Sequence, residues 1–390
     1  MKKLYKLQFL KNKFKIYDYM FSFYKYFIII LVLISCNSKN KIQNIDDLNV
    51  TKKTFIIDSN TNYSFLTLDY YISGDGREYF FNLDSKNSSL VIYDYVTSKK
   101  IKKINIPSNI MGFLVHSLDS IFLLAYMDNI LLLIDSSGTT KNRWDLNTLI
   151  HDSIKYEAWA NNFMRLFYIN NKLYIYTLPV VKLKEVVKFP LLSIFSLKCD
   201  TLTLEKKLLN FTKKYHDFNY MTYYPFITLN NDNDIIISYE IEDSIYVITN
   251  EFLEYKYYSK SNFIDSFKVF NQSKWYNKKY NNSYHIEAPT YGQVIYDKYR
   301  NIYYRIVKHG QDEVNKDGSK NDYFDRSWSI IVLDSNFKII KEIYMQPKNY
   351  RFTDLVLTRD GLLISDNHEN NPKFNPNLLS FIVLNIENEK

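Results

Sequence analysis

The chain has 390 residues, a formal net charge of +8 and a hydrophobic content of 46%. This content suffices for the core of one large β domain or of two smaller domains. The chain has two cysteines, and because the first is assigned below to a lipid anchor, an intrachain disulfide is excluded.

An export signal is predicted at the beginning of the chain. The apolar run at 27–34 follows a lysine-rich segment. It is shorter than the roughly 20 residues that span a bilayer, but it fits the apolar part of a signal peptide, about 7 to 15 residues. The sequence LISC at 33–36 resembles the lipobox, in which a small residue precedes a cysteine that is acylated before cleavage. We therefore predict that residues 1–35 are removed and that Cys36 carries a diacylglycerol and acyl modification. A second start at Met20 would give a signal of ordinary length; a buried strand that ends in an inert cysteine is the alternative interpretation.

Removal of this signal changes the charge of the protein. Seven lysines and one aspartate are lost with it, so the formal net charge falls from +8 to +2. A nearly neutral, exported protein offers no electrostatic basis for binding nucleic acid. Residues 36–50 are predicted to form a lipidated tether. We expect a lipid-anchored protein of the cell envelope. The outer membrane is the favoured location, and the protein lies on either its periplasmic or its external face.

A repeated unit fills the rest of the chain. An apolar strand, an Asp or Asn turn and a second strand that carries lysines recur six times, a pattern typical of an all-β protein. The turn residues are Asp94, Asp135, Asp200, Asn250, Asp334 and Asn385. Their spacings are 41, 65, 50, 84 and 51 residues, and the smaller values suit one four-stranded propeller blade. We therefore predict a six-bladed β-propeller over residues 51–390.

A propeller must also close its ring, because open edges invite aggregation. The last blade is short of a strand, and the segment TKKTFIID at 51–58 is predicted to supply it from the N-terminal side. The two large spacings predict insertions, which lie near 147–163, 182–189, 259–287 and 310–325. In the first of them, DSIKYEAWANNF at 152–163 is predicted to form a short helix. A β-sandwich or two stacked β domains is the alternative architecture.

The lipobox, the six hairpins and two C-terminal stretches, PTYGQVIYDKYRNIYYRIVKH and RFTDLVLTRDGLLIS, resemble an uncharacterised lipoprotein family of the Gram-negative envelope, the domain of unknown function 4221. The resemblance covers nearly all of the mature chain. It implies an envelope-anchored six-bladed propeller, and it brings no assigned activity.

Charged residues near strand ends at the predicted channel are candidates for ligand binding. His285 and Glu287 precede the fifth blade, Arg351 and Asp354 precede the sixth, and His368 follows its second strand. The alternative, which is favoured, is that these five side chains lie in solvated loops or make structural hydrogen bonds.

Two further candidates, Arg305 and His309, lie in the strand sequence YYRIVKH. Alternation places Arg305 on a face with Tyr303 and Val307. An arginine on a half-buried strand face usually has a carboxylate partner or a bound anion. The structural salt bridge is favoured here.

Neither a metal site nor a catalytic residue is predicted. The histidines have no partners at ligand spacing, and no nucleophile motif is present. Cys199 is expected in a strand turn as an inert thiol. No cofactor is predicted beyond the acyl group on Cys36.

The long insertion carries aromatic residues that suggest sugar stacking. These are Trp275, Tyr276, Tyr280 and Tyr284. Tyrosine is also a good strand residue, so sugar binding by the insertion is one hypothesis beside a purely structural use.

The favoured function is a noncatalytic, membrane-anchored platform that binds an unidentified envelope protein or a glycan, because propellers present loops rigidly and no catalytic constellation is visible. The alternative is an exported hydrolase that acts on a sugar, lactone or peptide in the propeller channel. Whether the protein is an enzyme therefore stays open, with the noncatalytic interpretation preferred. A structural part of a larger envelope assembly is a third possibility.

Overall fold

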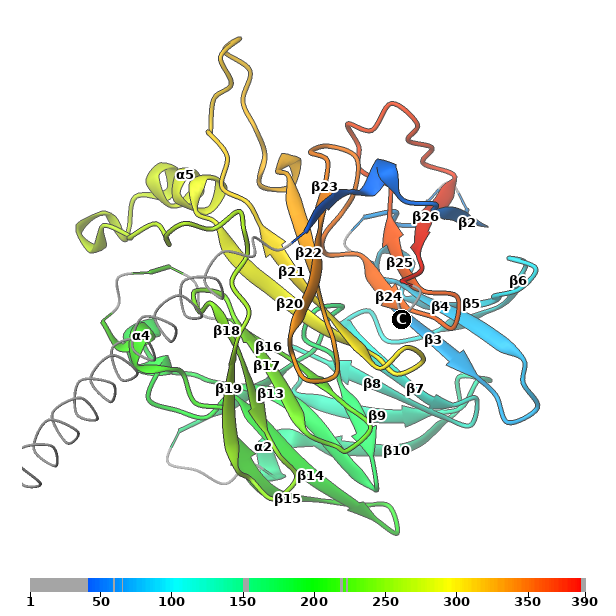
Figure 1. Cartoon of the computed structure of the whole chain (residues 1–390). Coiled ribbons are helices and arrows are strands. Elements are labelled where there is room, and N and C mark those ends of the chain that lie inside the picture. Colours follow the sequence, from blue (N-terminus) through cyan, green and yellow to red (C-terminus); the bar gives the residue numbers. More distant parts are fainter. Residues whose placement is uncertain are drawn as a thin grey trace, which may run out of the picture. The chain divides into compact units, whose positions relative to one another are not determined.

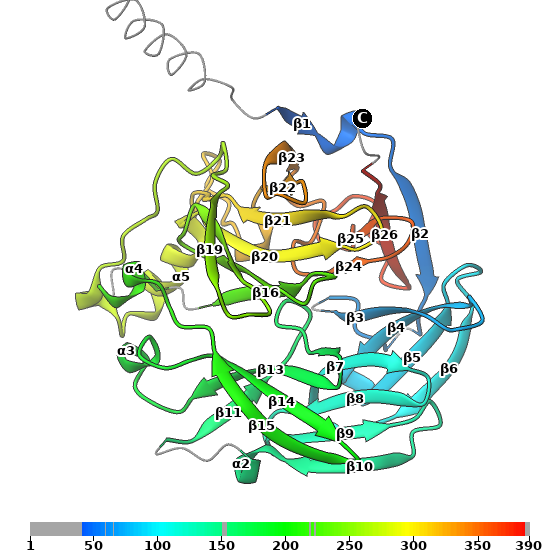
Figure 2. The ribbon, with the colours of Figure 1, turned by 60° about the horizontal axis from the view of Figure 1, so that its bottom comes forward.

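Six antiparallel sheets follow one another around a ring, as Figures 1 and 2 show. The computed structural model describes residues 41–58, 60–64, 66–149, 154–217, 220–221 and 224–386. The predicted signal peptide at 1–35, the second start at Met20 and the lipidation site Cys36 lie outside the described residues. The prediction of a six-bladed β-propeller is confirmed.

The first three blades use consecutive segments of the chain. Blade 1 consists of β3 (Thr67–Ile72), β4 (Glu78–Asp84), β5 (Ser89–Asp94) and β6 (Lys100–Asn105). Blade 2 consists of β7 (Ile110–Ser117), β8 (Ser120–Ala125), β9 (Ile130–Ile134) and β10 (Thr140–Asp145). Blade 3 consists of β11 (Tyr156–Trp159), β13 (Lys172–Pro179), β14 (Leu192–Lys198) and β15 (Thr201–Leu208), with the short β12 (Phe167–Ile169) beside β13.

Blade 4 also uses consecutive strands, whereas blades 5 and 6 each include a strand from the N-terminal part of the chain. Blade 4 consists of β16 (Pro225–Leu229), β17 (Ile235–Tyr239), β18 (Ser244–Ile248) and β19 (Glu254–Tyr258). Blade 5 consists of β20 (Thr290–Asp297), β21 (Ile302–Lys308), β22 (Trp328–Leu333) and β23 (Ile339–Met345), with β1 (Ile42–Asn44) on its outer edge. Blade 6 consists of β24 (Leu355–Leu357), β25 (Leu362–Ser365), β26 (Leu378–Leu384) and β2 (Thr51–Ile56).

In the described ranges, helices are few and lie in the connections. The α-helices there are α2 (Leu146–Leu149), α3 (Leu183–Val186), α4 (Lys213–His216) and α5 (Lys278–Glu287). The 3₁₀ turns are η1 (Ile45–Asp47), η2 (Ser85–Asn87), η3 (Gln272–Lys274) and η4 (Tyr323–Asp325). Among the residues that the structure describes, no helix combines the length and the apolar character needed to cross a membrane.

The sequence repeat corresponds to one position in every blade. The turns at Asp94, Asp135, Asp200, Asn250 and Asp334 join the third and fourth strands of blades 1 to 5, and the turn residue Asn385 directly follows the third strand of blade 6. In blades 1 to 4 the lysine-bearing strand of the repeat is therefore the outermost strand. Lysines on an exposed sheet edge oppose pairing with another chain, which gives the repeated lysines a physical role.

The N-terminal strand closes the ring, as predicted. Strand β2 pairs with β26 in antiparallel register, from Thr51 opposite Val383 to Ile56 opposite Leu378, and Figure 2 shows the two strands side by side. Phe55 of β2 is fully buried and stacks on Phe80 of blade 1 at 4.2 Å between ring centroids. The closing strand thus ties the last blade to the first.

The segment predicted as a tether is folded from residue 42 onward. Strand β1 pairs in parallel with β23 of blade 5, and Ile45, which follows it, is fully buried in the core between blades 5 and 6. The charged residues Lys341 and Glu342 of β23 are buried, so they do not protect the edge of this strand from pairing with another chain. Strand β1 covers the edge instead. Residues 42–50 are therefore part of the propeller and not a free linker.

One hydrophobic cluster fills each interface between neighbouring blades. Each strand points alternate side chains at the two neighbouring blades. In β4, for example, Phe81 packs toward blade 2 and Phe80 toward blade 6. Because every blade is covered on both faces, its inner strands, such as β4 and β5, are nearly continuous buried runs, which contributes to the high hydrophobic content of the chain.

The two faces of the ring differ in the length of their connections. The tight turns between first and second and between third and fourth strands lie on one face, here called the turn face; in blade 3 the first of these turns joins β12 to β13. The second-to-third and blade-to-blade connections lie on the other, here called the insertion face, and they include the long segments 259–289, 309–327 and 366–377. The helix predicted within 152–163 is wrong: Tyr156–Trp159 is β11, because alternate side chains there, Tyr156 and Ala158, are buried against blade 2.

We expect Ile45→Ala to lower the free energy of unfolding by roughly 2 to 4 kcal/mol, because it leaves a cavity in the core between blades 5 and 6. Ile42→Ala is the matched control, since Ile42 lies in β1 with half of its surface (51%) exposed. Chemical denaturation of both variants tests the expectation. Equal, small losses would show that this segment does not pack against the propeller.

Candidate functional site

A pocket of about 550 Å³ opens on the insertion face between blades 4, 5 and 6. This volume lies in the range of small-molecule sites, about 300 to 1,000 Å³. Phe226 of blade 4 and Phe163 line one part of it, and Tyr323, Phe324 and Phe352 line another. Aromatic rings therefore form two parts of the pocket wall.

An ion pair inside the pocket joins two blades. Lys308, the last residue of β21, places its Nζ 3.0 Å from Oε1 of Glu240, which follows β17. Both side chains are nearly buried, at 7% and 5% exposure. The Tyr323 hydroxyl lies 3.3 Å from Lys308 Nζ, and the backbone N–H of Tyr224 donates to Glu240 Oε2. Burial alone would lower the pKa of Lys308, but Tyr323 and Glu240 raise it above its ordinary value, so the lysine is charged at neutral pH.

Arg326 holds the walls of the pocket in place. Its guanidinium donates to the carbonyl oxygens of Tyr323, His285, Ile286, Ala288 and His309. It therefore fixes the end of α5 against η4. Because its N–H groups donate to these backbone oxygens, we assign Arg326 a structural role.

His285 is the one sequence-predicted candidate that lines the pocket. It lies on α5, which begins after Asn277, whose side chain caps the Tyr280 N–H. Burial lowers the pKa of His285, and the neighbouring charges of Lys308 and Arg326 lower it further. The imidazole is therefore neutral at neutral pH. Glu287 of the same helix pairs with Lys268 instead of entering the pocket.

The central channel is crossed by a segment of blade 3. The Asn162 side chain donates to the carbonyl oxygens of Thr353 (2.6 Å) and Leu355 (3.3 Å), and it accepts the Leu68 N–H (3.3 Å). Arg165 adds a bond to the Leu355 carbonyl oxygen at 3.0 Å. These bonds join blade 3 to blades 6 and 1 across the axis, so the channel centre is occupied by protein.

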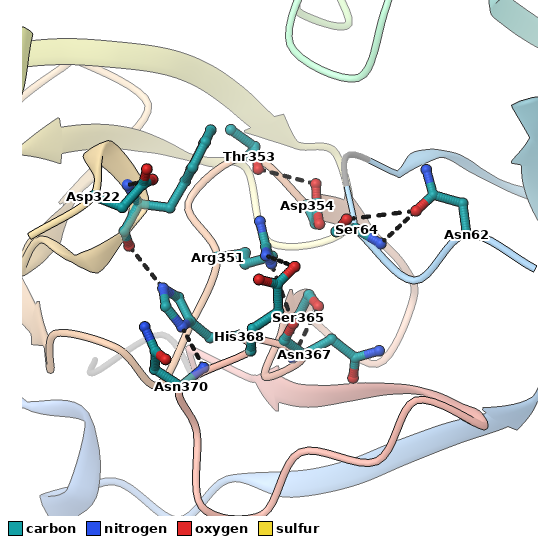
Figure 3. A network of polar contacts seen from close by, with 12 residues as sticks. Asn62, Ser64, Asp322, Arg351, Thr353, Asp354, Ser365, Asn367, His368 and Asn370 are labelled. Carbon is teal, nitrogen blue, oxygen red and sulfur yellow. Dashed lines mark hydrogen bonds and ion pairs between the residues drawn. The ribbon is translucent and has the colours of Figure 1, made fainter. Parts of the chain in front are cut away.

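Three candidates gather beside the pocket on blade 6, in the network that Figure 3 shows. Arg351 Nε donates to the Asn367 carbonyl oxygen at 3.1 Å. Asp354 Oδ1 accepts the Leu66 N–H and the Thr353 hydroxyl. His368 Nε2 donates to the carbonyl oxygen of Phe324 at 3.0 Å, and burial is the main reason that its pKa is lowered. Since Thr353 and Phe324 line the pocket, these side chains support its wall.

Within the part of the chain that the structure describes, Arg305 does not form the expected salt bridge. Its guanidinium donates to the hydroxyls of Ser238 and Ser259 and to three carbonyl oxygens of blade 4, and it stacks on the Tyr291 ring at 3.5 Å. Burial lowers its pKa to about 10, so it remains charged. Neutral oxygens can satisfy all of its donors here because the strand ends of blade 4 converge on it. The residue joins blades 4 and 5.

His309 lies in a buried network away from the pocket. Its ring nitrogens contact the hydroxyls of Ser327 (3.1 Å) and Ser329 (2.9 Å), and the ring stacks on Phe263. Ser329 in turn donates to Glu342 at 2.6 Å. Burial lowers the pKa of His309 to about 3, with a smaller effect of Arg326. All these groups are interior, so we assign the network to the scaffold.

The aromatic residues of the long insertion mostly form a small core of their own. Trp275, Tyr280 and Tyr284 pack around Phe270, with ring centroids 5.0 to 5.4 Å apart. Only Tyr276 of the four predicted sugar-stacking residues is largely exposed, at 95%. Stacking of a sugar on the three packed rings is therefore disfavoured.

The sequence interpretation missed Glu240, Lys308, Tyr323 and Arg326. A signal for the first two exists in the repeat: both lie at the insertion-face end of the second strand of adjacent blades, and their charges are opposite. Tyr323 and Arg326 lie in or beside an irregular connection, where no periodicity marks them. In the described ranges, no group of three or more His, Cys, Asp or Glu side chains is placed to hold a metal ion.

These features define a six-bladed β-propeller with a ligand-sized pocket on its insertion face. The chain belongs to the family described as domain of unknown function DUF4221, whose model matches residues 43–344; the resemblance found in the sequence is confirmed.

Solved structures share this fold. A DUF4221 member from Bacteroides vulgatus is 19% identical with a TM-score of 0.72, covering 87% of this chain and 98% of that one. A putative exported protein from Bacteroides fragilis is 10% identical with a TM-score of 0.51, covering 89% and 99%. No curated protein matches the chain.

We expect His309 to make the propeller acid-sensitive. Between its ordinary pKa of 6.5 and the folded value of about 3, the unfolded chain binds the proton and the folded chain does not. Stability therefore falls as the pH drops below about 6.5, by roughly 1.4 kcal/mol per pH unit from this group. His309→Gln should lose about 2 to 3 kcal/mol less than the wild type between pH 7 and pH 4.5. Urea unfolding at both pH values measures this difference; identical losses would contradict a buried, neutral His309.

Proposed function

We propose that this protein is a noncatalytic binding protein of the bacterial cell envelope, anchored through a lipid on Cys36, whose insertion-face pocket receives a small ligand or the end of a larger partner. The pocket itself carries the proposal. Its aromatic walls surround an ion pair, Lys308 with Glu240, in which each charge neutralises the other. Such a pair binds and orients polar groups.

The alternative, a hydrolase that works in the propeller channel, has less support. Asn162 and Arg165 occupy the centre of the channel with bonds to opposite blades. The candidates Arg351, Asp354 and His368 are engaged in holding backbone and neighbouring side chains. The arrangement favours a rigid recognition surface.

The membrane location is supported by the sequence alone. The lipobox at 33–36 and the lysine-rich start favour export and acylation. Because residues 42–44 pair with blade 5, an anchor on Cys36 would reach the propeller after only a few residues. We therefore place the protein close to a membrane surface, with the outer membrane preferred.

Cys36→Ala is expected to move the protein from the membrane fraction to the soluble fraction, because the acyl group has no other attachment site. Cys199→Ala, at an exposed cysteine in the propeller, is the matched control and should leave the protein in the membrane fraction. Fractionation with a high-salt wash measures both. A Cys36→Ala protein that stays in the washed membranes would overturn the lipid anchor.

Gly292→Val is expected to weaken ligand binding, because Gly292 lies in the pocket lining and an added Cβ would meet Ile306 side-chain atoms at 3.2 and 3.3 Å. Gly74→Val is its control, since a Cβ there meets no atom within 4 Å. Overpacking should also cost Gly292→Val about 1 to 3 kcal/mol of stability.

The measurement is a thermal-shift screen of small molecules on the wild type and on both variants. Hits whose affinity falls only in Gly292→Val support the pocket. Hits whose affinity is the same for Gly292→Val and the wild type argue against binding in the pocket. Turnover of a hit by the wild type would establish the hydrolase instead.

A further inference from the structure

We propose that the pocket binds a neutral sugar ring, such as the terminal unit of a glycan, with its hydroxyls on Lys308 and Glu240 and its apolar face on the aromatic walls. This inference rests on the proposed binding function of the pocket. The sequence suggested a sugar site on the aromatic residues of the long insertion; we assign the site instead to the pocket between blades 4, 5 and 6.

The ion pair is balanced in charge but has hydrogen-bonding capacity left. An ammonium has three donors, and the contacts of Lys308 with Glu240 and Tyr323 use two. A carboxylate accepts about four hydrogen bonds, and Glu240 accepts one from Lys308 and one from Tyr224. Counting contacts with the described residues only, one donor and two acceptor positions thus remain within the same few ångströms. Adjacent sugar hydroxyls, each both donor and acceptor, match this arrangement.

Aromatic rings flank the ion pair. Lys308 Nζ lies 5.8 Å from the centre of the Phe226 ring and 3.3 Å from the Tyr323 hydroxyl. Tyr323 belongs to a cluster with Phe324 and Phe352, whose rings stack at 5.6 Å. A sugar ring carries C–H groups on its faces and hydroxyls on its rim, so it can cover apolar rings while its rim reaches the ion pair.

The charges around the pocket disfavour an anionic ligand. Glu240 neutralises Lys308, and Asp322, an exposed residue, adds a carboxylate to the lining. Arg326, a cation beside the pocket, points its donors at backbone carbonyl oxygens. The neutral His285 adds no positive charge. Among the described lining residues, Lys308 is therefore the only cation, and it is paired with Glu240, so the pocket disfavours a phosphate or carboxylate.

Ligand-observed saturation-transfer NMR on the mature chain, purified from membranes into lipid nanodiscs, tests the inference. The probes are neutral hexoses, N-acetylhexosamines and their disaccharides. Hexose 6-phosphates and uronic acids form an anionic arm, and aromatic dipeptides form an apolar arm. We expect saturation to reach the ring C–H groups of at least one neutral sugar.

Three variants locate the binding. Lys308→Met should weaken the sugar roughly tenfold or more, because it removes a charged hydrogen-bond donor. Glu240→Gln, which keeps the side-chain shape, should lose neutral sugars and gain anionic ones, because Lys308 is then unpaired. Tyr276→Ala removes the exposed aromatic of the insertion and should leave affinity unchanged. If Lys308→Met does not fold, Glu240→Gln and Gly292→Val carry the test.

The outcomes separate the ligand class from the pocket function. Binding only of anionic or aromatic probes, lost in Gly292→Val, would overturn the sugar while the pocket remains a binding site. Absence of any probe that responds to Gly292→Val would overturn both. Sugar binding that falls in Tyr276→Ala but persists in Lys308→Met would return the site to the insertion and overturn the inference.

Discussion

The structure depends on the closure of the ring by its N-terminal strand. A blade has two apolar faces, and each face is buried only if a neighbour lies on both sides. The pairing of β2 with β26 completes blade 6, and Phe55 carries the contact to Phe80 of blade 1. Without this pairing, the cluster between blades 6 and 1 and the edge of β26 would be open to water. Closure therefore converts six sheets into one cooperative body.

The candidate site follows from this ring. Tight turns occupy the turn face, so all long connections rise from the insertion face and surround the space above the blades. Arg326 locks α5 against η4, and His368 holds the Phe324 backbone from blade 6. The pair of Lys308 and Glu240 lies where blades 4 and 5 meet. Because the pocket is assembled from several blades, its shape is rigid only while the closed ring holds the blades in their relative positions.

Much of the fold was predictable because its signals are local. The turns at Asp94, Asp135 and Asp334 mark the same hairpin in blades 1, 2 and 5, and the strand missing from the last blade pointed to Thr51–Ile56 as its completion. Strand β11 was mistaken for a helix, since one short apolar segment is ambiguous without its neighbours. The folding of residues 42–50 onto blade 5 was missed because β1 has only three residues, too few to show the alternation of a strand.

The site was less predictable because its residues meet only through the ring. Phe163 and Phe352 line one pocket although 189 positions separate them, and no spacing rule links them. Charge and position near predicted strand ends selected Arg351, Asp354 and His368, which support the pocket wall, and also His285, which is in the lining. For Arg305, the expectation of a carboxylate partner failed because serine hydroxyls and carbonyl oxygens satisfy a buried guanidinium equally well.

Closure by β2 can be measured directly with an engineered disulfide. Thr54 lies opposite Ser380 in the β2–β26 register, so Thr54→Cys with Ser380→Cys should cross-link under mild oxidation and raise the temperature of unfolding. Lys53→Cys with Ser380→Cys is the control, because adjacent strand residues point to opposite faces of the sheet. We expect the disulfide in the first pair and little in the second. Equal or absent cross-linking in both pairs would contradict ring closure by the N-terminal strand.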